Sequence, residues 1–135
     1  MPLSGEIITT GMAQTGSTPK RVWRTWFPQA SNPAGSDGIC KVILGPVPSG
    51  QSWLVEFARI QNNSSAASDL EVFRNDENNP LSSIDSAPGA GNDNSETFPS
   101  PGAWVGEGDK LIYVWSNADA GSVGTVNAQV KISQG

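Results

Sequence analysis

The chain has 135 residues, a formal net charge of −5 and only 16% charged residues, with 15 Gly and 10 Pro. This length suits one domain with its own core, and the turn-forming residues favour many short elements over helices. The acidic balance disfavours nucleic acid and anionic membranes as partners. The single cysteine, Cys40, excludes an intrachain disulfide, and its apolar surroundings indicate a small buried hydrophobe.

The first part of the chain predicts an arm, a strand and a loop in that order. Residues 1–20 predict an extended N-terminal arm. Residues 20–27 alternate along a strand, so Trp23 and Trp26 would lie on opposite faces and one of them would meet a partner or another copy. Residues 29–38 combine Ser, Asn, Pro, Gly and Asp, which predicts a loop.

The middle of the chain predicts three strands, over residues 39–45, 53–60 and 69–74. The second of these is apolar on most of both faces, which suits a sandwich interior or a subunit contact. Residues 75–102 form a long polar region, and a structureless loop of that length is unusual in a compact domain. We therefore expect further short strands within it.

Three features of this polar region predict its local structure. Apolar residues predict one short strand near 81–84 and another near 96–98. Residues 87–94, rich in Pro, Gly and Asn, predict an exposed tip between them.

The end of the chain gives the clearest alternation. Residues 110–115 predict one strand and residues 123–133 another, joined by the Asn and Gly turn at 117–121 into a hairpin. With about eight strands at short spacing, the chain predicts an all-β fold. We expect an antiparallel β-sandwich over residues 21–135, jelly-roll-like in its connections and preceded by the arm.

Catalytic groups are scarce. The chain contains no histidine, which excludes Ser-His-Asp and Cys-His arrangements and the usual zinc sites. Glu56 lies in an apolar run, where burial could raise its pKa as in a glycosidase acid, but we favour the simpler interpretation that it faces solvent or pairs with Arg59 or Lys41. The sequence therefore predicts a non-enzymatic protein without a catalytic residue or cofactor.

Two loops raise the question of calcium. Residues 75–78 and 92–96 gather Asn, Asp and Glu oxygens, the ligands that calcium prefers. Neither follows the EF-hand order, and Asn and Asp are common in turns for conformational reasons. We expect no metal site, with calcium binding as the alternative.

Charge and aromatic residues single out one candidate contact. Basic residues cluster before and within the first strand, whereas residues 69–96 hold seven acidic residues and one basic residue. Trp and Arg dominate interface hot spots, so this pattern predicts docking onto an acidic partner or a neighbouring copy. The predicted contact residues are Lys20, Arg21, Trp23, Arg24, Trp26 and Phe27. An aromatic platform for sugar is the competing interpretation.

Two segments resemble jelly-roll structural proteins of tailed bacteriophages. Residues 104–115, in which Gly106-Glu107-Gly108-Asp109 opens a strand, look like the start of the closing hairpin of those domains, and the alternating residues 126–132 look like its partner. Residues 47–55 resemble their Pro-x-Gly turn and apolar strand.

This resemblance implies a capsid decoration or cement protein. Such proteins are usually trimeric and sit on the major capsid protein, and collar and minor tail proteins share similar domains. The expected partners are therefore further copies of the chain and the major capsid protein. The start of the chain has no basic segment followed by an apolar one, so we expect synthesis in the host cytoplasm and a final location on the virion surface.

Overall fold

The computed structural model of the chain describes residues 22–98 and 100–134. The predicted arm over residues 1–20 lies outside these residues, as do Lys20 and Arg21 of the predicted contact. The division into an arm and a domain therefore stays a prediction.

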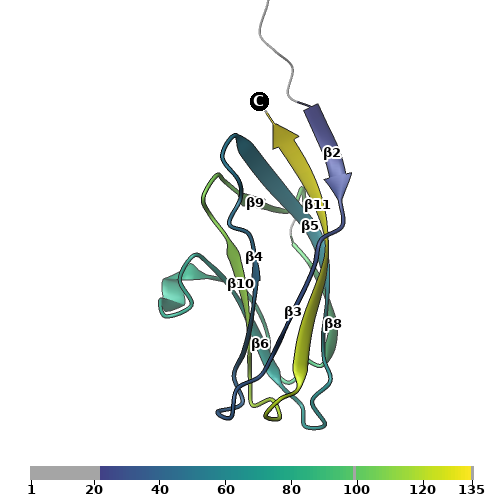
Figure 1. Cartoon of the computed structure of the whole chain (residues 1–135), viewed down its shortest axis with the longest axis vertical. Coiled ribbons are helices and arrows are strands. Elements are labelled where there is room, and N and C mark those ends of the chain that lie inside the picture. The colour runs from purple at the N-terminus through teal and green to yellow at the C-terminus, as the bar shows by residue number, and fades with distance from the viewer. Residues whose placement is uncertain (1–21, 99, 135) are drawn as a thin grey trace, which may run out of the picture.

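The described residues form ten strands and one short 3-10 turn, η1 (Figure 1). In chain order these are β2 (Val22–Trp26), β3 (Gln29–Pro33), β4 (Cys40–Leu44), β5 (Gln51–Asn62), β6 (Asp69–Arg74), η1 (Pro80–Ser82), β7 (Ser83–Ala87), β8 (Asp93–Thr97), β9 (Ala103–Val105), β10 (Leu111–Ser116) and β11 (Val123–Gln134).

The strands form two antiparallel sheets. One has the order β4-β10-β6-β7; the other has the order β2-β11-β5-β8, with β3 also on β11 and β9 also on β5. Because β2 and β3 share one edge position and β8 and β9 share another, the ten described strands fill eight positions. When these positions are numbered in chain order, the first pairs with the eighth, the second with the seventh, the third with the sixth and the fourth with the fifth. This nested pairing is a jelly roll, so the predicted fold class is confirmed.

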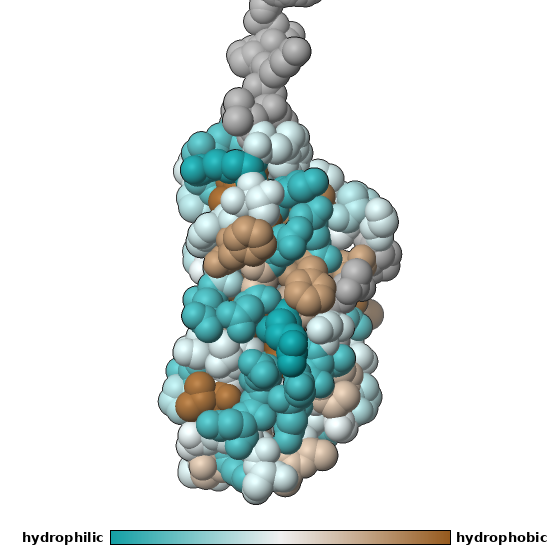
Figure 2. Space-filling view, turned by 90° about the vertical axis from the view of Figure 1, so that its right-hand side faces the viewer, coloured by the Kyte–Doolittle hydropathy of each residue, from teal (hydrophilic) through white to brown (hydrophobic). Residues whose placement is uncertain are grey.

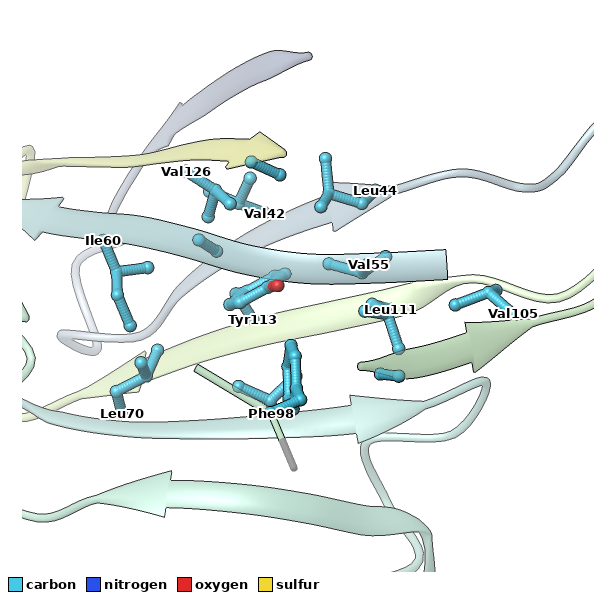
Figure 3. Close-up of a cluster of buried hydrophobic side chains, with 14 of the residues drawn as sticks. Val42, Leu44, Val55, Ile60, Leu70, Phe98, Val105, Leu111, Tyr113 and Val126 are labelled. Atoms are coloured by element: carbon cyan, nitrogen blue, oxygen red, sulfur yellow. The ribbon is translucent and has the colours of Figure 1, made fainter. Parts of the chain in front are cut away.

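The core lies between the sheets and comes from the alternate residues that each strand points inward (Figure 3). In β4, for example, Cys40, Val42 and Leu44 are buried while the residues between them are exposed. Tyr113 of β10 lies within the cluster, and its burial raises the pKa of its hydroxyl group. The buried alternation confirms the predicted strands that contribute most to the core.

Trp115 of β10 packs closely against Gly91 and against Gly124 of β11. Its indole Nε1 donates a 2.6 Å hydrogen bond to the carbonyl of Gly91. A Cβ atom at Gly91 would lie 2.8 Å from Trp115 Cδ1, and one at Gly124 of β11 would lie 2.8 Å from Trp115 Cζ3. Glycine is required at both positions because the indole occupies the space of a side chain.

The predicted hairpin of residues 110–115 with 123–133 is wrong. Strand β10 pairs with β4 and β6, whereas β11 pairs with β2, β3 and β5 in the opposite sheet. The connection crosses between the sheets and is tied to other loops, since Ala118 donates its amide to Gly38 and Gly121 donates to Ala34. The turn residues marked a reversal of direction but did not specify that the chain stays in one sheet.

Two loop predictions are also corrected. Residues 29–33 form strand β3, because β11 supplies backbone partners for a segment whose side chains are mostly exposed and polar. The predicted tip at 87–94 is exposed only in part, because Ala87 and Gly91 are buried. The strands expected near 81–84 and 96–98 occur as β7 and β8, each displaced by a few residues.

Asp119 organises the loops at the end of the sandwich away from η1. Its Oδ2 accepts hydrogen bonds from the hydroxyl and the amide of Ser65, at 2.6 and 2.7 Å, and its own amide donates to Ser64 Oγ at 2.9 Å. The two hydrogen bonds from Ser65 hold the pKa of the Asp119 carboxyl below its ordinary value, and the bond from the Ser65 hydroxyl contributes most. The β5–β6 and β10–β11 loops are thereby joined.

Gly124→Ala tests the packing around Trp115. We expect a loss of about 1–3 kcal/mol in the free energy of unfolding, because the added methyl group meets the indole and Cys40 Sγ at 2.8 Å. Urea unfolding measures this. Gly106→Ala is the matched control, because its Cβ would meet only Asp109 Oδ2 at 3.5 Å. Equal stability of the two variants would contradict the packing described.

Asp119→Asn tests the loop network through pH. Because the folded pKa lies below the unfolded value of 3.8, the ionised carboxylate stabilises the fold fully above that value, and the contribution is lost as the pH falls through the folded pKa. The wild-type protein should therefore be more stable than the variant at neutral pH, and the difference should shrink in acid. Urea unfolding at several pH values measures this, and a difference that stays constant would refute the assignment.

Candidate assembly surface

Strand β2 forms an edge of the six-stranded sheet and carries most of the predicted contact. It pairs with β11 on one side, and within the described residues no strand pairs with its other side. Trp26 lies opposite the buried Val130, and Trp23 lies opposite Ser133. The two indoles therefore belong to opposite faces of the strand, as predicted from the alternation.

Trp26 closes one end of the core while staying partly exposed. Its ring meets that of Trp53 edge to face, with centroids 5.2 Å apart. Trp53 is buried, whereas Trp26 keeps 42% of its surface exposed and Phe27, the next residue, keeps 71%. Aromatic rings left at a sheet edge offer a large apolar area to a partner.

An apolar depression, the edge groove, lies where the β2 and β3 edge of one sheet faces the β4 edge of the other. At one end the two edges are tied together, because Asn32 Nδ2 donates to the Lys41 carbonyl and Cys40 Sγ donates to the Asn32 carbonyl. At the other end they leave a cavity of about 540 Å³. Its walls are formed by Trp26, Phe27, Pro28, Gln29, Ala30, Ile43, Leu44, Gly45, Pro46, Pro48 and Trp53.

The edge groove continues into a second depression of about 310 Å³, which shares Trp26, Pro48 and Trp53 with it. Arg24, Thr25 and Gln51 join Trp26 and Trp53 in lining it. No Asp or Glu lines either depression among the described residues, and Arg24 is exposed. The apolar surface is therefore bordered by positive charge.

A second aromatic feature lies on the outer face of the same sheet. Trp23 lies on β2 and Trp104 on β9, and strands β11 and β5 lie between these two in the sheet. The centroids of their rings are nevertheless only 5.7 Å apart. Their rings must therefore lean over β11 and β5, which explains why outward-facing Leu54 is only 6% exposed. Figure 2 looks onto this side of the molecule and shows scattered hydrophobic side chains on a mostly hydrophilic surface.

A shallow depression of about 320 Å³ adjoins this Trp pair, lined by Trp23, Arg24, Thr25, Leu54 and Lys131. Lys131 Nζ lies 3.5 Å from Glu56 Oε2, and Gln129 Nε2 donates to Glu56 Oε1 at 3.1 Å. Glu56 thus pairs with Lys131 rather than with either partner considered from the sequence. Arg59 instead pairs with Asp93, and Lys41 pairs with Glu77.

The other chemically distinctive groups serve the fold. Burial raises the pKa of the Cys40 thiol, which disfavours the reactive thiolate. In the two acidic loops, the side chain of Asn75 bonds Asp109 and Lys110, and that of Asn92 bonds Ser68 and backbone carbonyls. No group of three His, Cys, Asp or Glu side chains is placed to hold a metal among the described residues.

Four predicted contact residues, Trp23, Arg24, Trp26 and Phe27, lie on one edge and are exposed. Their role in binding stays a prediction. The sequence alone did not identify Ile43, Pro46 and Pro48, which come from a distant segment and form the opposite wall. The outward position of Ile43 in an alternating strand was the available signal.

Comparisons with known proteins leave the family open. No family model matches the chain, and no curated protein matches it in sequence. Among solved structures, the chain is similar to a virus-like particle of extra small virus from the giant freshwater prawn Macrobrachium rosenbergii, with 14% identity and a TM-score of 0.44. The match covers 100% of this chain and 95% of that one, but a similarity this low does not bear on function. The described residues contain no helix that is long and apolar enough to span a membrane.

Proposed function

We propose that the chain is a non-enzymatic structural protein of a viral particle that acts by binding further copies of itself and the particle's shell. The observation that carries the proposal is the edge groove, where Trp26, Phe27 and Ile43 are exposed beside strand edges that no other described strand covers. Edge strands are normally protected by charge or by short length, because their free backbone groups promote association. An edge with exposed aromatic residues supports association as its purpose.

The viral part of the proposal is supported by architecture and by resemblance. Jelly rolls are common in viral coat proteins, and they also occur in lectins and cupins. The resemblance of residues 47–55 to tailed-phage structural proteins favours the viral role among these. The resemblance of residues 104–132 to a closing hairpin does not add to it, because β10 and β11 lie in opposite sheets. The finer proposal is a homotrimeric decoration or cement protein bound to the major capsid protein on the virion surface.

Phe27→Asp tests self-association through the edge groove. Phe27 is 71% exposed, so the variant should fold, while a charge in the apolar contact should cost about 2 kcal/mol or more, which is roughly a 30-fold weaker association. Sedimentation equilibrium over a range of protein concentrations measures this. Val123→Asp replaces another exposed apolar residue outside the groove and should associate like the wild type.

The cement role needs a separate measurement. Wild-type protein should sediment with purified empty capsids of a tailed phage, and Phe27→Asp should reduce the bound amount if the groove also meets the shell. A wild-type protein that is strictly monomeric and does not bind capsids would exclude the structural role.

Binding of carbohydrate, as in a receptor-binding module of a tail or collar, is the second candidate. The observation that favours it is the Trp23 and Trp104 pair beside Thr25 and Lys131, an exposed aromatic surface with polar groups at its rim. A glycan array decides the question. In this case Trp23→Ala and Trp104→Ala should abolish glycan binding while Phe27→Asp leaves it unchanged. Absence of glycan binding by the wild type would remove the candidate.

A further inference from the structure

The β6–β7 connection forms a projecting apolar turn, the knob, at Asn79, Pro80 and Leu81. Leu81 is 93% exposed, and η1 stands clear of the two sheets (Figure 1). Leucine at this exposure makes almost no contact with its own chain. It therefore contributes little to the fold and offers its whole side chain to a neighbour.

The knob is held in one conformation. Asn79 Oδ1 accepts a hydrogen bond from the Leu81 amide at 3.0 Å, the Ser82 amide donates to the Asn79 carbonyl at 2.8 Å, and Pro80 fixes its own backbone φ angle. Its base is tied to the four-stranded sheet, since Glu77 pairs with Lys41 at 2.9 Å. A preorganised turn loses little conformational entropy on binding.

The edge groove complements this knob in shape and polarity. Its cavity of about 540 Å³ falls in the range of about 300–1,000 Å³ typical of small-ligand pockets, and its walls are mainly aromatic, aliphatic and proline side chains, with Gln29 as a polar group. A leucine and a proline presented together match such walls.

Charge also favours the contact. Asp76 and Glu77 precede the knob, whereas no acidic residue lines the groove and Arg24 borders it. Opposite charges at the rim would orient the approach and disfavour wrong arrangements.

We propose that Leu81 of one copy inserts into the edge groove of the next copy, so that the copies associate head to tail. This inference rests on the proposed self-assembly and specifies its contact. Because the knob and the groove are different surfaces, the interface is heterologous, and repeated contacts close into a ring or extend as a chain. The homotrimer proposed above would be a closed ring of three.

A symmetric contact is the clear alternative. If two copies met through their β2 edges, each groove would face the other groove and both knobs would remain exposed. Substitution of Leu81 would then leave association unchanged, which separates the two arrangements.

A mixing experiment tests the inference. Leu81→Asp removes the knob but keeps the groove, and Phe27→Asp damages the groove but keeps the knob. Each variant alone should be monomeric in sedimentation velocity, because it lacks one half of the contact. An equimolar mixture should form a 1:1 dimer and stop there, because the remaining knob and groove of that dimer are the damaged ones. Both substituted residues are highly exposed, and circular dichroism confirms folding.

The outcomes separate the two proposals. If wild type and Val123→Asp associate, Phe27→Asp does not, and Leu81→Asp associates like the wild type, the knob is not the occupant and the inference is overturned while self-assembly stands. If the mixture stays monomeric although the wild type associates, head-to-tail insertion is likewise overturned. If the wild type itself is monomeric at every concentration, the proposed self-assembly fails and this contact fails with it.

Discussion

Strand β11 is the constraint on which the edge groove depends. Residues Val130–Gln134 hold β2, residues Val123–Asn127 hold β3, and β5 pairs along nearly the whole strand on its other side. Among the described strands, β2 and β3 pair only with β11. They can therefore form the edge beside β4 only when β11 has paired with β5. The groove has its walls within residues 26–53, yet it depends on β11 at the other end of the described chain, so its formation requires the complete jelly roll.

The edges of the sandwich differ in a way that supports directed assembly. Strand β8 carries Asp93, paired with Arg59 at 2.7 Å, and β7 carries Asp85, so these edges are charged as edges of monomeric proteins usually are. The edge formed by β2, β3 and β4 carries exposed aromatic and aliphatic side chains instead. Strands β7 and β8 are thus protected from strand-to-strand pairing, whereas the edge of β2, β3 and β4 is suited to an apolar contact.

The sequence predicted the strands better than their partners. Alternation located β4, β6 and β11, because inward and outward positions differ in polarity, and continuous apolar runs located β5 and β10. Strand β3 lacked this signal, because its side chains are mostly exposed at an edge and only backbone pairing defines it. The predicted jelly roll and the predicted final hairpin also exclude each other, because a jelly roll places its last two strands in opposite sheets. For the candidate site, alternation predicted that Trp23 and Trp26 lie on opposite faces and that one of them meets a partner. The exposure of both, and the position of the outward-facing Ile43 opposite them, depend on tertiary structure.

The central claim is that the edge groove becomes buried when copies of the chain associate. A cryo-EM structure of the assembled protein tests this most directly, because it shows what covers Trp26, Phe27 and Ile43. The account predicts that all three lie within a contact between copies. An assembly in which these side chains remain open to solvent, with the copies joined elsewhere, would contradict it.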